Sequence, residues 1–288
     1  MANNITEILG GSFFGQNLSG TLRCKCFENI SSDIWHKVIE AHNVGYDLDE
    51  RGITDFVIVQ LLNYYHSKIK NFGLYTQKGW KESENGGDID VFVEVQPDKY
   101  VWFALQAKVL KLENQYPTDT IRHCNSSGEW QWDLLKNLEK NSGCKAYYLF
   151  YNGRKNADIK LLGDKCSRSF DISQFGCSLV EPEIVKKIAN RTNGSRGYLS
   201  PSFEDFHPQY AQPWRILTCC KHDYSNSSVY SLVDILGALR NYEVLIPAQV
   251  PSDFVANTFQ DNPISISSLR SGWKAAVTMI SQLTSPKK

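Results

Sequence analysis

The segment from Gly86 to Val109 constrains the fold of this chain most strongly, because it predicts one β-hairpin. Two runs rich in β-branched and aromatic residues lie on either side of Pro97 and Asp98, and both of these residues favour a turn. Side chains alternate between the two faces of a strand, so this segment can be tested for a buried face and a polar face.

Alternation along the two runs gives one face that is entirely apolar. This face carries the odd-numbered residues Ile89, Val91, Val93, Val95, Val101, Phe103, Leu105, Ala107 and Val109. The opposite face carries Asp88, Asp90, Glu94, Gln106 and Lys108, together with Phe92, Trp102 and Ala104. A shift of one residue would bury a carboxylate among the valines, which is energetically costly. The hairpin therefore has a core face and a face that collects carboxylates, an amide and a lysine.

The register across the hairpin depends on the loop. A three-residue loop at 97–99 would place Asp90 opposite Gln106 and Asp88 opposite Lys108, with opposed Cβ atoms about 4.5–5.5 Å apart. This is the geometry that a metal-dependent phosphodiesterase needs. The alternative is a half-exposed hairpin with ion pairs between Lys108 and either aspartate, each worth about 0–1 kcal/mol.

The pattern of Asp90, a hairpin and then Gln106-Ala107-Lys108 resembles the PD-(D/E)xK, or restriction-endonuclease-like, nuclease superfamily. It is most similar to the Mrr-type variant, in which the second acid is replaced and the motif becomes Gln-x-Lys. The resemblance covers about residues 45–152. It implies a central mixed β-sheet flanked by helices, Mg²⁺ or Mn²⁺ as cofactor, and DNA more than RNA as substrate. It also implies a role in bacterial restriction or anti-phage defence.

The resemblance also assigns residues to the site. Asp90, Gln106, Lys108 and Glu50 would be catalytic. Asp90 would be the central metal ligand, and the Gln106 side-chain oxygen, the Ala107 carbonyl and Glu50 would complete the set; Asp88 is a spare acid. An upstream helix supplies the third acid in this superfamily, and Glu50 is preferred over Asp55 because it shares a helix face with Thr54. The simpler alternative is that both acids complement the helix dipole.

Four residues near the hairpin are candidates for substrate binding. Lys78, Lys81 and Lys111 could contact phosphate, although a solvated loop explains Lys78 and Lys81 equally well. Gln131 would lie on the first turn of a helix near the site, where a surface amide is the simpler reading. The acidic stretch at 203–208, which includes His207, fits loop caps and turns better than catalysis.

The composition limits where the chain can act and how it can bind nucleic acid. The 288 residues carry a formal net charge of zero, so contact with nucleic acid must come from a local basic patch or a partner. No run approaches the 18 apolar residues of a membrane span, and no signal peptide is expected. Eight cysteines without zinc-site spacing suggest reduced thiols in the cytoplasm. Partners could include a second copy of the chain or other defence proteins.

The remaining elements predict an α/β fold. A helix is expected at 31–43, with the glycines at 10, 11 and 15 breaking any longer helix. Strands are expected at 72–78, 144–151 and 175–180, and helices at 129–140, 181–190, 229–239 and 268–283. Residues 1–160 would form the nuclease core, and 161–288 a C-terminal region of unknown role, with substrate or partner binding as one option.

Two functions remain open from the sequence. The first is a metal-dependent endonuclease. The second is a catalytically inactive nuclease fold that binds nucleic acid or a partner protein, because Gln106 removes one negative charge from the metal site. Metal binding at the hairpin separates the two.

Overall fold

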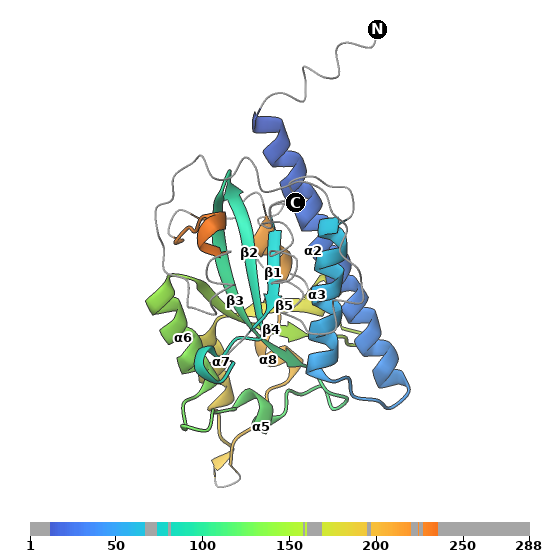
Figure 1. The fold of residues 1–288 in the computed structure, drawn as a ribbon. Helices are drawn as coiled ribbons and strands as arrows, with labels where there is room; N and C mark the ends of the chain where they lie inside the picture. The colour runs from blue at the N-terminus through green and yellow to red at the C-terminus, as the bar shows by residue number, and fades with distance from the viewer. Residues whose placement is uncertain are drawn as a thin grey trace, which may run out of the picture.

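The computed structural model describes residues 12–66, 74–79, 82–157, 159, 169–194, 197–219, 224 and 227–235. These residues form an α/β fold in which a mixed sheet lies between two groups of helices (Figure 1). The α/β class expected from the sequence is confirmed. The expected helix at 268–283 and residues 236–239 of the one at 229–239 lie outside the described residues, and residues 232–235 are helical.

The sheet has six strands in the order β1-β2-β3-β4-β5-β6. Their bounds are β1 Leu74–Lys78, β2 Ile89–Gln96, β3 Lys99–Val109, β4 Lys145–Tyr151, β5 Cys177–Val180 and β6 Gln212–Pro213. Neighbouring strands pair antiparallel except β3 and β4, which are parallel. The sheet thus continues past residue 160, where the sequence suggested a boundary, into β5 and β6.

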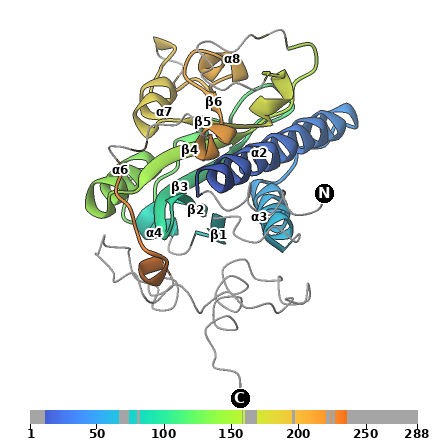
Figure 2. The same cartoon turned by 90° about the horizontal axis from the view of Figure 1, so that it is seen from above.

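Helices cover both faces of this sheet (Figure 2). The helices α2 (Ser12–Asn43) and α3 (Glu50–His66) pack on the face that carries the odd-numbered residues of the hairpin. The other face is covered by α6 (Gln131–Ser142) and α7 (Pro182–Ala189), together with α5 (Thr118–Ile121) and α8 (Phe203–Phe206). The hairpin therefore has the core face that its sequence alternation predicts.

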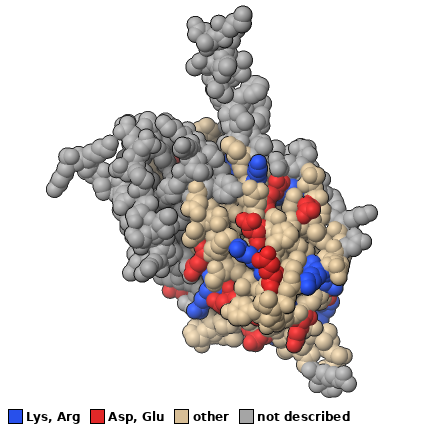
Figure 3. All heavy atoms as spheres, turned by 90° about the vertical axis from the view of Figure 1, so that its right-hand side faces the viewer, with Lys and Arg blue, Asp and Glu red and all other residues tan. Residues whose placement is uncertain are grey.

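The shorter elements complete the chain. They are α4 (Glu82–Asn85), just before β2, and the 3₁₀ helices η1 (Ile172–Gly176) and η3 (Trp214–Thr218). None of the described helices combines the length and apolar character needed to cross a lipid bilayer. On the face shown in Figure 3, which carries α2 and α3, acidic and basic side chains are interspersed among the described residues.

The first helix corrects an expectation. It begins at Ser12 and runs through Ser31, where the sequence suggested that a helix starts. Phe27, Ile34 and Val38 are buried along one stripe of this continuous helix, and burial of such a stripe outweighs the roughly 1 kcal/mol cost of Gly15 within it. Ser31 does not cap a helix; its hydroxyl exchanges hydrogen bonds with the backbone of Cys177.

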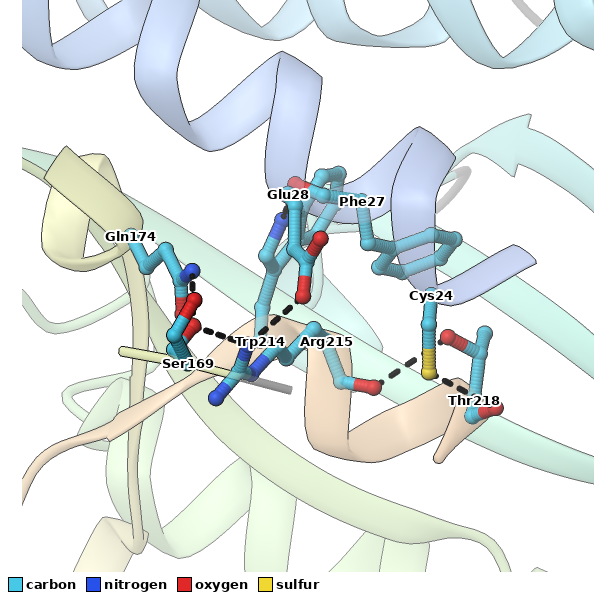
Figure 4. Close-up of polar contacts among 8 residues, drawn as sticks. All are labelled: Cys24, Phe27, Glu28, Ser169, Gln174, Trp214, Arg215 and Thr218. Atoms are coloured by element: carbon cyan, nitrogen blue, oxygen red, sulfur yellow. Dashed lines mark hydrogen bonds and ion pairs between the residues drawn. The ribbon is translucent and has the colours of Figure 1, made fainter. Parts of the chain in front are cut away.

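The crossing of α2 over η1 is unusually close. A Cβ atom added to Gly176 would lie 1.9 Å from the Ser31 carbonyl oxygen, so only glycine fits there. On the same side of the molecule, η3 is joined to α2 by a buried ion pair (Figure 4): Arg215 Nη1 lies 2.6 Å from Glu28 Oε1. Trp214 Nε1 also donates to the Phe27 carbonyl. The segment 214–217 is therefore part of the same core as the N-terminal helix.

Candidate functional site

The hairpin turn sets the register that arranges the polar residues. The loop contains two residues, Pro97 and Asp98, with Asp98 at a φ of 56°, and Gln96 pairs with Lys99. The pairing then shifts between Glu94 and Gln96, which marks a β-bulge. On the side of the bulge away from the turn, Asp90 pairs with Ala104, so the expected pairing of Asp90 with Gln106 is wrong by two residues. A shift of two keeps every side chain on its predicted face.

Asp88 takes the place that the sequence gave to Asp90. Its Oδ2 atom accepts hydrogen bonds from the Gln106 side-chain Nε2 and from the Ala107 backbone N–H, the latter at 2.8 Å. Its own backbone N–H donates to the Leu105 carbonyl, which extends the strand ladder to the site. Asp88 is therefore locked against Gln106 by the ladder and by its side chain.

Asp90 lies one pair further along the hairpin, in a different environment. Its carboxylate accepts a 2.8 Å hydrogen bond from Trp102 Nε1, and only 7% of the residue is exposed. Trp102 packs with Phe92 and Tyr230 in a small apolar cluster. The hairpin thus separates its two aspartates, since Asp88 contacts Gln106 whereas Asp90 contacts Trp102.

The third acid comes from α3, which begins at Glu50. Glu50 Oε1 lies 3.6 Å from Lys108 Nζ, and the Lys108 side chain is only 5% exposed. Thr54, one turn further, is buried and shares a 3.2 Å hydrogen bond with the Tyr151 hydroxyl, while Asp55 is exposed. The choice of Glu50 over Asp55 from helical spacing agrees with this geometry.

The loop before Asp88 holds the site against α6. Gly86 has a φ of 73°, and a Cβ atom there would lie 2.9 Å from the Gln131 carbonyl oxygen. A residue with a side chain would therefore be both strained and crowded. Gln131 is buried on the first turn of α6, so it is not the surface amide that seemed simpler from the sequence.

The lysines expected to bind substrate have separate outcomes. Lys111 donates from Nζ to the Leu48 carbonyl at 2.8 Å, so this lysine ties the end of β3 to the loop before α3. Lys78 ends β1, but its side chain is outside the described part of the structure, as is all of Lys81. Of the four predicted substrate residues, Gln131 is the one that the described structure places against the loop leading into Asp88.

The oxygen atoms around Asp88 and Gln106 are of the kind that Mg²⁺ prefers. Among the described residues there is no group of three or more His, Cys, Asp and Glu side chains suited to a metal ion. Mg²⁺ is, however, commonly held by one or two carboxylates with water and substrate phosphate. Gln106 Oε1 is buried and has no hydrogen-bond partner within the described residues, while Nε2 of the same amide faces Asp88. This orphaned oxygen beside a carboxylate fits a hard cation.

One buried residue at this site was not singled out from the sequence. Tyr148 on β4 pairs with Gln106 across the parallel β3–β4 ladder, and it is fully buried. Burial raises the pKa of the Tyr148 hydroxyl, and the carboxylates of Asp133, Asp88 and Glu50 raise it further. The alternation of β4 carried the signal, but the parallel register that brings Tyr148 beside Gln106 could not be deduced without the structure.

The polar segment after residue 200 has a structural role, as expected. Asp205 accepts from the backbone N–H of Ser202 and forms a capping box at the start of α8. His207 is buried, and burial lowers its pKa to about 3. It shares a 2.7 Å hydrogen bond with Ser178, within a network that continues to Asn152 and Tyr116.

These observations define an α/β protein whose β-hairpin carries an acid–amide–lysine cluster joined by an acid from a preceding helix. The chain belongs to the family of unknown function DUF6615, whose model matches residues 23–285. This match spans both the hairpin and the segment after residue 160. No curated protein and no solved structure matches the chain.

Proposed function

We propose that this protein is a divalent-metal-dependent phosphodiesterase that cleaves nucleic acid, with DNA the expected substrate. The observation that carries the proposal is the contact of Asp88 with Gln106 and Ala107, next to the ion pair of Lys108 with Glu50. Oxygen ligands for a divalent ion beside a buried lysine are groups that metal-assisted hydrolysis of a phosphodiester can use. The resemblance to PD-(D/E)xK nucleases supports the same chemistry.

The geometry favours Asp88 over Asp90 as the principal metal ligand. Asp88, Gln106 Oε1, the Ala107 carbonyl and Glu50 would hold Mg²⁺ or Mn²⁺ through oxygen atoms. The ion, when bound, would polarise the scissile phosphate and lower the pKa of a coordinated water. Asp90, held by Trp102, would instead stabilise the hairpin.

Lys108 would act on the reacting phosphate. The Lys108 side chain is almost fully buried, and its ammonium nitrogen lies 3.6 Å from Glu50 Oε1, beyond hydrogen-bond distance. A buried cation in this position can hold the attacking water or offset the negative charge that develops on the pentacovalent phosphorus. Glu50 limits the cost of burying this charge until substrate arrives.

A second candidate is a nuclease fold that binds nucleic acid without cleaving it. Gln106 favours this alternative, because an amide in place of a carboxylate removes one negative charge from the ligand set. Retained affinity for Mn²⁺ at Asp88 would support the enzyme, whereas binding of nucleic acid without metal dependence would support the module. A role in anti-phage defence follows only from the resemblance.

Cleavage of plasmid and single-stranded DNA and of RNA, with Mg²⁺ or Mn²⁺, tests the proposal. Wild type is compared with Asp88→Asn, Lys108→Met and the matched control Asp90→Asn, in which the amide oxygen can still accept from Trp102. We expect cleavage to be lost in the first two variants and retained in the control, with circular dichroism unchanged in all three. Activity that survives Asp88→Asn and Lys108→Met would remove this mechanism.

A further inference from the structure

Two polar atoms on neighbouring strands are buried without a hydrogen-bond partner in the described part of the chain: Gln106 Oε1 and the Tyr148 hydroxyl. Buried polar groups are paired in about 90% of cases or more, so each exception needs an explanation, and a bound water or ion is one. Gln106 and Tyr148 are direct partners in the parallel β3–β4 ladder, so their side chains leave the same face of the sheet. One atom accepts a hydrogen bond and the other can donate one.

The surroundings of Tyr148 keep it a donor. Tyr148 belongs to the same buried apolar cluster as Trp132 and Leu135, its ring lies 6.2 Å from that of Phe150, and the residue is fully buried. The raised pKa of Tyr148, caused by burial and then by nearby carboxylates, means that the phenol keeps its proton at neutral pH. Asp133, the carboxylate with the largest effect, is itself engaged by Lys186 Nζ at 2.7 Å. The hydroxyl thus has a proton to donate and no acceptor within the described fold.

We propose that Tyr148 is a positioning residue whose hydroxyl donates a hydrogen bond to an oxygen atom bound to the same divalent ion as Asp88 and Gln106. The oxygen belongs either to a water molecule or to a backbone phosphate of the nucleic acid. This inference rests on the proposed function and deepens it. It assigns to β4 a contact that neither the family description nor the sequence motif contains.

The variant Tyr148→Phe tests the assignment, because it removes only the hydroxyl. A hydroxyl with no partner in the fold contributes nothing to folding, so the melting temperature is expected to stay equal or to rise. The matched control is Tyr116→Phe, another fully buried tyrosine, whose hydroxyl donates to Asn152. The control is expected to melt at a lower temperature while binding Mn²⁺ like wild type.

Ligand binding gives the second readout. If the oxygen is water, the affinity for Mn²⁺ without nucleic acid falls about tenfold in Tyr148→Phe, as is common for groups that orient metal ligands. If it is a phosphate oxygen, Mn²⁺ affinity is unchanged and the affinity for an oligonucleotide in Ca²⁺ falls instead. Unchanged values for both, or a melting temperature lowered as in Tyr116→Phe, would overturn the inference.

Asp88→Asn separates failure of this inference from failure of the proposed function. Loss of Mn²⁺ binding in Asp88→Asn with no change in Tyr148→Phe would overturn the role of Tyr148 alone. A wild-type protein that binds no Mn²⁺ would overturn the proposed function and this inference together.

Discussion

Buried His207 should make the protein sensitive to acid. Its Nδ1 atom lies 2.9 Å from the Phe203 carbonyl oxygen, which can only accept, so Nδ1 carries the proton and Nε2 accepts from the Ser178 hydroxyl. The ring stacks on Phe203 with centroids 4.0 Å apart and is only 2% exposed. Such surroundings favour the neutral imidazole, and burial lowers the pKa of His207 to about 3.

The sign and size of the effect follow from linkage. The folded pKa lies below the unfolded value of about 6.5, so the unfolded chain gains a proton first as the pH falls. Stability is therefore lost between about pH 6.5 and pH 3, at up to about 1.4 kcal/mol per pH unit. From pH 6.5 to pH 3.5 the loss from this residue reaches about 4 kcal/mol.

Urea unfolding measured at several pH values between 3.5 and 7.5 checks this expectation. Carboxylates also contribute to acid sensitivity, so the comparison is with His207→Gln, which cannot titrate. We expect this variant to be less stable than wild type at pH 7.5 but to lose less stability on acidification, while the exposed His123→Gln behaves as wild type. Equal slopes for wild type and His207→Gln would show that His207 does not cause the acid sensitivity, and so would an NMR titration of His207 near pH 6.5 in the folded protein.

Three further perturbations test the fold around the site. Glu28→Gln and Arg215→Met each break a buried ion pair and should each lower the unfolding free energy by about 3–5 kcal/mol. The double variant should lose less than the sum of the two single losses, and additive losses would show that the two residues are not coupled. Gly176→Ala should destabilise the protein by about 2 kcal/mol, because its Cβ atom would meet the Ser31 carbonyl. Gly52→Ala, on the open surface of a helix, should instead stabilise the protein by about 0.5–1 kcal/mol. Thermal melts that reverse this order would contradict the close packing at Gly176. Trp102→Phe removes the hydrogen-bond donor to Asp90 and should lower the unfolding free energy by about 1–3 kcal/mol while leaving the affinity for Mn²⁺ unchanged. Weaker Mn²⁺ binding in this variant would indicate that Asp90 is a metal ligand.

The faces of the hairpin could be predicted from sequence, but its register could not. Alternation alone decides which side chains are buried, and Ile89, Val91 and Phe103 are in the core as expected. The register depends on the loop length and on the bulge between Glu94 and Gln96, which together shift the pairing by two residues. Because a shift of two preserves the faces, the apolar pattern gave no warning that Asp88, and not Asp90, meets Gln106.

For the helices, the sequence predicted which face a residue occupies but not where the first helix begins. Spacing on α3 placed Glu50 on the helix face of Thr54 and Asp55 on another, since local geometry decides which face a residue occupies. In the structure Glu50 Oε1 lies 3.6 Å from Lys108 Nζ, a contact that spacing did not predict. The start of α2 was missed, because Ser31 has the character of a cap and Gly15 that of a helix breaker. Long-range packing of α2 on η1 and η3 decided otherwise, and it involves residues more than 140 positions away, such as Cys177 and Trp214.

Titration with Mn²⁺ of wild type, Asp88→Asn and Asp90→Asn, measured side by side, decides which aspartate binds the metal. We expect one Mn²⁺ site in wild type, loss of that site in Asp88→Asn, and an affinity close to wild type in Asp90→Asn. Binding that is lost in Asp90→Asn and retained in Asp88→Asn would contradict the arrangement of Asp88, Gln106 and Lys108 as a metal-dependent active site.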